Sequence, residues 1–509
     1  MSESKPTSES REDPTQTPGD DAERVAESTR TMGRGAMAAL LGQIVGRGSE
    51  YGVGVIVGRV LGAPVLGAVE LILRMIRIAG MLTMVGLPHA NNKFIAQSLA
   101  HEDARGVRAV ARKTGILSIV LAVLSSIAIF CLAPVLALDV YQRPELLAPM
   151  RLAGLAAPAL ALTLIILAIP QAARNIWPQV LIARMGVPAL FLLGVPIALY
   201  LGGELTAVIS TYVAASFVGL ILAAGLRGRW LPGESGTGHT EASFREILGF
   251  SGVVYIGSIG VFMTNLADVF VIGKFVSEHD LGVYAAAART ASFITFPLFS
   301  INSLFAPTIS DLYARGATDA LRETYRTAAR WTAGAGAGVY GLMAIAPQQI
   351  LSVFGSEFHE GMVPLVLLGA GYFVNSATGG VGWLLTMTGN HRIAAFTNWM
   401  AGAVLATSLF FVVPRHGLLG AAICTGSAMA VSNLVKMLLV WWKLGVIPLT
   451  RRYLSSLAVT ATVILVLRAL CATGGPGWSP QAIWALGLFA VCHTAVFLLG
   501  WAPEAARRG

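Results

Sequence analysis

Long apolar stretches recur along this chain and constrain its fold more than any other feature. Many of them reach about 20 residues, enough for a helix to cross a hydrocarbon core of about 30 Å. Only 12% of the residues are charged, about half the share found in an average soluble protein. Because a backbone in lipid must satisfy its own hydrogen bonds, these stretches are expected to be helices. The sequence therefore predicts an all-α polytopic membrane protein.

The apolar stretches predict about fourteen transmembrane helices. The candidate spans lie near 36–61, 65–88, 110–133, 149–170, 177–201, 205–226, 247–275, 281–306, 330–353, 362–388, 393–413, 417–441, 452–472 and 481–502. Lys and Arg concentrate in the alternate connections that include both ends of the chain. Since basic residues are retained on the cytoplasmic side, we expect both termini in the cytoplasm of a bacterial inner membrane. An even number of spans agrees with that orientation.

The sequence repeats itself with a period of about 215 residues, because segment 57–74 aligns with 272–289 without a gap. This alignment pairs Gly67 with Gly282, and Arg74 with Arg289. Six spans per repeat insert both copies the same way up, as in transporters with two parallel lobes. The predicted organisation is a disordered cytoplasmic tail at 1–34, an N-lobe at 35–226, a cytoplasmic linker at 227–246, a C-lobe at 247–443, and two additional helices with a short tail at 444–509.

Several functional classes find no support in the sequence. It contains no GxxxxGK[ST] loop for nucleotide phosphates, no His/Cys cluster with metal-ligand spacing and no convincing catalytic triad. The net charge of +9 is spread over the connections between spans rather than gathered in a basic domain. We therefore expect no enzyme activity, no cofactor, no metal and no nucleic-acid partner. Any transport would be driven by an ion gradient or by the gradient of the substrate.

A family resemblance rests on two segments of the repeat. "GRVLGAPVLG" at 58–67 resembles the Arg-x-Leu-Gly-x-x-x-x-Gly signature that follows the first helix of polysaccharide-type flippases. Segment 268–316 is similar to its counterpart in the second lobe, and the resemblance covers roughly residues 35–443. The superfamily includes multidrug and toxic-compound extruders as well as O-antigen and lipid II flippases. The resemblance implies a V-shaped bundle of two lobes that moves undecaprenyl-linked saccharides between leaflets by alternating access.

Charged residues interrupt the first two predicted spans. Arg47 and Glu50 lie near the middle of the first span, where each charge costs about 2.5–3.5 kcal/mol to insert. Three residues apart on a helix, they share one face, so they could form an ion pair or line a polar cavity between the lobes. The second span adds Glu70, Arg74 and Arg77. This is more charge than mutual neutralisation requires, which favours the cavity.

The resemblance to lipid II flippases implies a phosphate-binding role for arginines in helices one, two and eight, because guanidinium groups bind phosphate oxygens in pairs. Arg77 competes with Arg74 for the position in helix two, and Glu70 could hold Arg74 in place. The predicted substrate-binding residues are Arg47, Arg74, Arg77, Arg289 and Asn265. Glu50 and Asp268 are the candidate ion-coupling acids, since a carboxylate within a span can carry a proton. Asp268 could instead be a partner for Lys274 or Arg289.

The sequence as a whole predicts a flippase for undecaprenyl-pyrophosphate oligosaccharides in cell-surface polysaccharide biosynthesis. Its expected partners are the lipid-linked oligosaccharide, membrane lipids, a polysaccharide polymerase and glycosyltransferases. One alternative is a proton- or sodium-coupled multidrug or toxin antiporter, although such extruders favour lone acids and aromatic residues over clustered arginines. Another is a membrane scaffold for polysaccharide synthesis without transport activity, which would need no inward-facing charges.

Overall fold

The computed structural model describes residues 18–233, 242–471 and 480–501, and within these ranges the regular structure is entirely helical. The α-helices are α1 Pro18–Met84, α2 Leu87–Ala100, α3 Ala104–Pro134, α4 Leu147–Ala172, α5 Val187–Tyr200, α6 Leu205–Trp230, α7 Phe244–Phe275, α8 Glu278–Ala291, α9 Phe296–Ala314, α10 Thr318–Ile345, α11 Pro347–Leu351, α12 Met362–Thr378, α13 Val381–Met387, α14 His391–Leu444, α15 Arg451–Cys471 and α16 Pro480–Trp501. Short 3-10 or π turns join some of them, at Val135–Val140, Pro144–Leu146, Gln179–Gly186, Ser292–Thr295 and Ser356–Gly361. The predicted all-α class is confirmed.

Two of the helices contain a reversal of the chain. In α1 the break lies at Gly62, with φ 82° and ψ 177°, and in α14 it lies at Gly417, with φ 52° and ψ −136°. Both conformations fall in the region that favours glycine. The first reversal brings Arg77 within 3.0 Å of Glu50, so the two parts of α1 run side by side. Eight helices in the described ranges are long and apolar enough to cross a membrane. The figure of fourteen spans stays a prediction.

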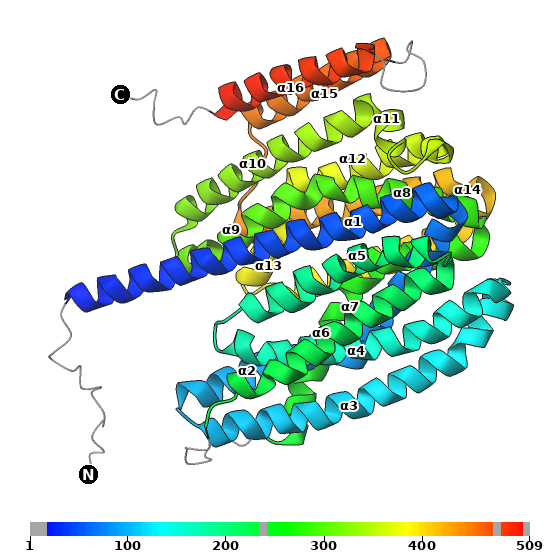
Figure 1. Ribbon diagram of the computed structural model, residues 1–509. Helices are drawn as coiled ribbons and strands as arrows, with labels where there is room; N and C mark the ends of the chain where they lie inside the picture. Colours follow the sequence, from blue (N-terminus) through cyan, green and yellow to red (C-terminus); the bar gives the residue numbers. More distant parts are fainter. Residues whose placement is uncertain (1–17, 234–241, 472–479, 502–509) are drawn as a thin grey trace.

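The helices lie side by side with roughly parallel axes (Figure 1). Helices α1–α6 pack mainly on one another, as do α7–α14, and α1 runs along α8 between the two groups. At one edge of the bundle α15 and α16 lie beside α10, and α3 lies at the opposite edge. We refer to 35–230 as the first half and to 244–444 as the second half; the predicted domain boundaries stay predictions.

Polar contacts fix the connection between the halves. Helix α6 continues to Trp230, into the predicted linker. Both sides of the linker are held by α3, because Arg108 donates to the Pro232 carbonyl at 2.8 Å and Lys113 to the Ala242 carbonyl at 3.0 Å. Helix α7 then starts with a reciprocal cap, in which hydrogen bonds from Ser243 lower the pKa of the Glu246 carboxyl.

The two halves approach each other closely at Gly67 and Gly282, which the sequence repeat aligns. A Cβ atom added to Gly67 would lie 2.7 Å from the Gly282 nitrogen, and one added to Gly282 would overlap the Ala63 carbonyl oxygen. The flippase-like signature supplies further contacts here. Arg59 donates to the Val353 carbonyl at 2.7 Å, and the Ala63 N–H after the Gly62 break donates to Glu357 at 2.8 Å. Residues of this signature thus join the two halves at one end of the bundle.

Replacing Gly282 by Val should force the halves apart at this contact. The added side chain meets backbone atoms, which cannot rotate away, so we expect the free energy of unfolding to fall by about 1–3 kcal/mol. Gly225→Val is the matched control, because nothing lies within 4 Å of a Cβ atom at Gly225. Thermal unfolding of the purified protein measures both variants, and equal stability of the two would contradict the close approach.

Candidate functional site

Charged side chains from both halves meet where α1 packs against α7 and α8. They are Arg47, Glu50, Glu70, Arg74 and Arg77 from α1, Asp268 from α7 and Arg289 from α8. We call this group the charge cluster. All of them except Glu70 were candidate site residues from the sequence, which suggested for Glu70 only that it holds Arg74 in place; the fold brings them together. Asn265, the remaining candidate, has a side chain that lies outside the described residues.

Glu70 links the two halves through an ion pair with Arg289. Its Oε1 lies 2.8 Å from Arg74 Nε, and its Oε2 forms a close ion pair with Arg289 Nη2 of the second half. The Glu70 side chain is only 5% exposed. Arg74 and Arg289 are equivalent positions of the repeat. One buried carboxylate therefore contacts two arginines that the sequence repeat aligns and that would otherwise repel each other.

Asp268 supplies a second link across the same interface. Its Oδ1 lies 3.3 Å from Arg74 Nη1, and the Tyr284 hydroxyl donates to its Oδ2 at 3.1 Å. Thr425 Oγ1 lies 3.0 Å from that hydroxyl. The ion-pair partner of Asp268 is therefore Arg74, rather than Lys274 or Arg289. Sequence analysis missed Tyr284 and Thr425, since a single hydroxyl in an apolar helix carries no pattern that marks its role.

Glu50 and Arg47 do not form the ion pair that their spacing allowed. Glu50 Oε1 lies 3.0 Å from Arg77 Nη2, and both of these side chains are 32% exposed. Arg47 donates to Gln43 Oε1 at 3.3 Å, and its guanidinium carbon lies 4.8 Å from the centre of the Phe299 ring. Within the described ranges, Arg47 is thus the arginine of the charge cluster without a carboxylate partner.

Small and aromatic residues seal the interface between the charge cluster and the Gly62 break. A Cβ atom at Gly54 would lie 2.6 Å from Arg289 Nη1, so the guanidinium group packs directly against this glycine. The Tyr51 ring meets Phe293 and Phe354 edge to face, with centroids 5.1 and 5.2 Å apart. Phe354 and Phe358 are fully buried. Water is therefore excluded from this part of the interface, which strengthens the neighbouring ion pairs.

A further set of polar contacts lies at the end of the interface near Gly62. Glu357 receives the hydrogen bond from Ala63 and lies 3.7 Å from His279. Arg143 lies 3.4 Å from Glu278, whose carboxyl pKa is raised by burial and by the neighbouring Glu145. These contacts tie the start of α8 to the first half and reinforce the closure at this end.

Comparison with known protein families shows the family to which the chain belongs. The sequence profile of the family described as polysaccharide biosynthesis protein matches residues 32–313, more than half of the chain. The chain belongs to this family. A second profile, MatE, matches residues 254–409, which lie in the second half of this polysaccharide biosynthesis protein. None of the curated proteins matches the chain.

Solved structures share the fold of this family member at low sequence identity. A lipid II flippase, MurJ, in an inward closed conformation superposes with a TM-score of 0.67 and 12% identity, covering 91% of this chain and 97% of its own. An inward-facing multidrug resistance transporter of the MATE family superposes with a TM-score of 0.66 at 16% identity, covering 81% of this chain and 98% of its own. A transporter of the MOP superfamily from Pyrococcus furiosus superposes with a TM-score of 0.58 at 16% identity, covering 82% of this chain and 95% of its own. The chain thus has the polytopic fold of MOP-superfamily transporters, and the expectation of a transporter rather than an enzyme agrees with these matches.

Glu70→Gln should destabilise this protein strongly. The substitution leaves Arg74 and Arg289 buried with one acid fewer, and removal of one partner from a buried ion pair typically costs about 3–5 kcal/mol. Glu323→Gln is the control, since the Glu323 carboxylate pairs with Arg330 at 2.9 Å but is 63% exposed. A loss of at most about 1 kcal/mol is expected there. Denaturation of both variants in detergent tests this, and similar small losses would contradict the bridging role of Glu70.

Proposed function

We propose that this protein is a flippase that moves an undecaprenyl-pyrophosphate oligosaccharide across the bacterial inner membrane by alternating access. The observation that carries the proposal is the charge cluster, in which four arginines face three carboxylates between the two halves. The family description supports a place in cell-surface polysaccharide biosynthesis. There the protein would act beside a polymerase and glycosyltransferases, with both of its termini in the cytoplasm.

Guanidinium groups suit this substrate because their planar forks bind phosphate oxygens in pairs. Arg47 has no described carboxylate partner, so a pyrophosphate can bind it without breaking an ion pair. Arg77 and Glu50 are the most exposed ion pair of the cluster. The substrate phosphates would next displace Glu50 from Arg77. Arg74 and Arg289 are held on Glu70 and would take part only when the halves separate.

The arrangement of contacts supports alternating access. The glycine contact, the aromatic layer and Glu70 close the interface towards Gly62, while Glu50 and Arg77 are partly open on the other side. In the orientation predicted from the basic residues, the open side faces the cytoplasm, where lipid-linked precursors enter. Opening at the Gly62 end then requires loss of the Glu70 bridge, which competition by substrate phosphates would favour.

Ion coupling is assigned in this proposal to Asp268 and Glu50. Protonation of Asp268 would remove its ion pair with Arg74 and leave its contact with Tyr284. Protonation of Glu50 would release Arg77 for the substrate. Asn265, one turn before Asp268 in α7, is assigned to substrate binding.

An ion-coupled multidrug or toxin antiporter is the second candidate function. The match of the MatE profile to residues 254–409 favours it, because that segment contains Asp268 and Arg289. In this case the acids of the cluster would couple export to protons or sodium, and the arginines would serve only to hold the halves together.

Flipping of an undecaprenyl-pyrophosphate oligosaccharide in proteoliposomes tests the proposal. We expect Arg47→Ala to slow the movement at least about tenfold, the effect of losing charge-assisted hydrogen bonds of about 1.5–3 kcal/mol. Arg47→Lys should be intermediate, since lysine keeps the charge without the fork. Arg415→Ala, near the Gly417 break and outside the cluster, should behave as the wild type.

Two other results would contradict the proposed flippase activity. If wild-type protein leaves the oligosaccharide in place but extrudes cationic dyes along a proton or sodium gradient, and Asp268→Asn abolishes this, the antiporter is correct. If the wild type moves neither compound, and the charge cluster can be replaced without loss of polysaccharide synthesis, the protein is a scaffold.

A further inference from the structure

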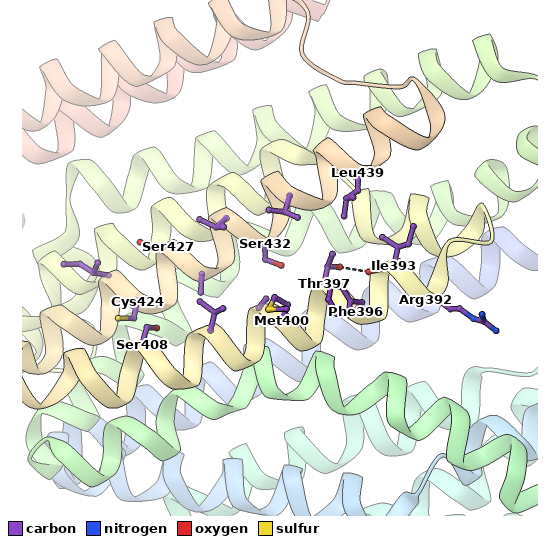
Figure 2. Close-up of a pocket in the computed structure, with 16 residues that line it drawn as sticks. Arg392, Ile393, Phe396, Thr397, Met400, Ser408, Cys424, Ser427, Ser432 and Leu439 are labelled. Atoms are coloured by element: carbon purple, nitrogen blue, oxygen red, sulfur yellow. Dashed lines mark hydrogen bonds between the residues drawn. The ribbon is translucent and has the colours of Figure 1, made fainter.

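The two parts of α14 enclose a groove away from the charge cluster. The chain reverses at Gly417, so that 391–416 and 418–444 run side by side, and a cavity of about 760 Å³ lies between them. Figure 2 shows labelled side chains from both parts facing this space. Phe396, Met400 and Val431 on its walls are 50–64% exposed. The groove is therefore open to the outside of the bundle, where a membrane protein faces lipid.

The walls of the groove are mainly hydrocarbon, although the buried Ser432 hydroxyl on them has no hydrogen-bond partner within the described part of the chain. The Thr397 hydroxyl donates to the Ile393 carbonyl at 3.0 Å, and the Ser408 hydroxyl donates to the Leu405 carbonyl at 2.9 Å. These side chains thus satisfy their hydrogen bonds within their own helix. The remaining lining is mainly aliphatic, with Val404, Ile423 and Val435 among its members. Such a surface fits an aliphatic chain better than a polar ligand.

One end of the groove carries positive charge. Arg392 lines this end and extends beyond it (Figure 2), and it makes no hydrogen bond or ion pair with any described residue. Arg392 lies in the first turn of α14, which receives no cap from the Asn390 side chain. Uncapped N–H groups at a helix start favour an anion. The guanidinium and the helix start together are complementary to a phosphate.

The length of the groove selects among lipids. Its lining in 391–416 extends from Arg392 to Ser408, about 24 Å along a helix at a rise of about 1.5 Å per residue. One leaflet of the hydrocarbon core is about 15 Å thick, so a single acyl chain fits below Arg392. An undecaprenyl chain of eleven isoprene units is much longer than this groove.

We propose that the groove of α14 binds one acyl chain of an anionic glycerophospholipid, whose phosphate contacts Arg392. A lipid bound there packs 391–416 against 418–444 and stabilises the second half. This site is separate from the charge cluster, and the test below measures lipid binding rather than transport. Its outcome is therefore independent of the proposed flippase activity.

Native mass spectrometry of the full chain, titrated with phosphatidylglycerol or phosphatidylcholine of identical acyl chains, tests the site. We expect wild-type protein to bind the anionic lipid about fivefold more tightly, the preference that one basic residue near an anionic lipid provides. Arg392→Gln should remove this preference and leave phosphatidylcholine binding unchanged. Lys443→Gln is the matched control, because Lys443 lies in the last turn of the same helix but stacks on Trp442 outside the groove.

A second variant blocks the groove itself. Ser427 is an exposed lining residue, so Ser427→Phe should fill the space without disturbing the core and weaken binding of both lipids about tenfold. Ala224→Phe, an exposed position on α6, should bind lipid as the wild type does. The melting temperature without added lipid shows whether each variant folds.

Three results would overturn the proposal. The first is an Arg392→Gln protein that keeps its preference for phosphatidylglycerol. The second is a Ser427→Phe protein that keeps its lipid binding but changes its oligomeric state, which would make the groove an interface between copies of the chain. The third is displacement of bound lipid by undecaprenyl phosphate but not by phosphatidylglycerol, which would assign the groove to the carrier lipid.

Discussion

The closed interface between the two halves depends on the ion pairs of Glu70. The repeat places Arg74 and Arg289 at equivalent positions on opposite sides of this interface, where two buried cations would repel each other. Glu70, the acid that contacts both of them, has no counterpart in the second half, because the repeat pairs Glu70 with Ala285. Asp268 of the second half adds a further carboxylate to Arg74. The contact between the halves is thereby stabilised by Glu70 together with Asp268.

The packing around Glu70 explains how charges persist at this depth. Gly67 and Gly282 let the helices touch through their backbones, and Gly54 leaves room for Arg289. Close approach of small residues provides van der Waals contact where lipid gives no hydrophobic driving force. The Tyr51 layer keeps water out on one side, so the ion pairs act in a low dielectric. In the proposed flippase the substrate phosphates compete for these same arginines, which makes the closure reversible.

The sequence predicted the all-helical fold, which is confirmed, because hydropathy is a property of the chain itself. The two-lobe repeat and the roles of the charged candidates stay predictions. Which arginine forms an ion pair with which carboxylate could not be predicted in the same way. Spacing along one helix suggested Arg47 with Glu50, but the reversal at Gly62 brings Arg77 to Glu50 instead. The roles of Tyr284 and Gly54 depend on how α8 meets α1 and α7. The way in which these helices cross is set by side-chain packing along their whole length, which a single sequence does not reveal.

A double-mutant cycle between Glu70 and Arg289 tests the bridge across the halves most directly. It compares the free energies of unfolding of Glu70→Gln, Arg289→Gln and the double variant with that of the wild type. Residues in contact couple by about 0.5–3 kcal/mol, and the burial of this pair predicts a value in the upper half of that range. Losses that add to within about 0.5 kcal/mol would show that Glu70 and Arg289 act independently, which would contradict an interface held by this carboxylate.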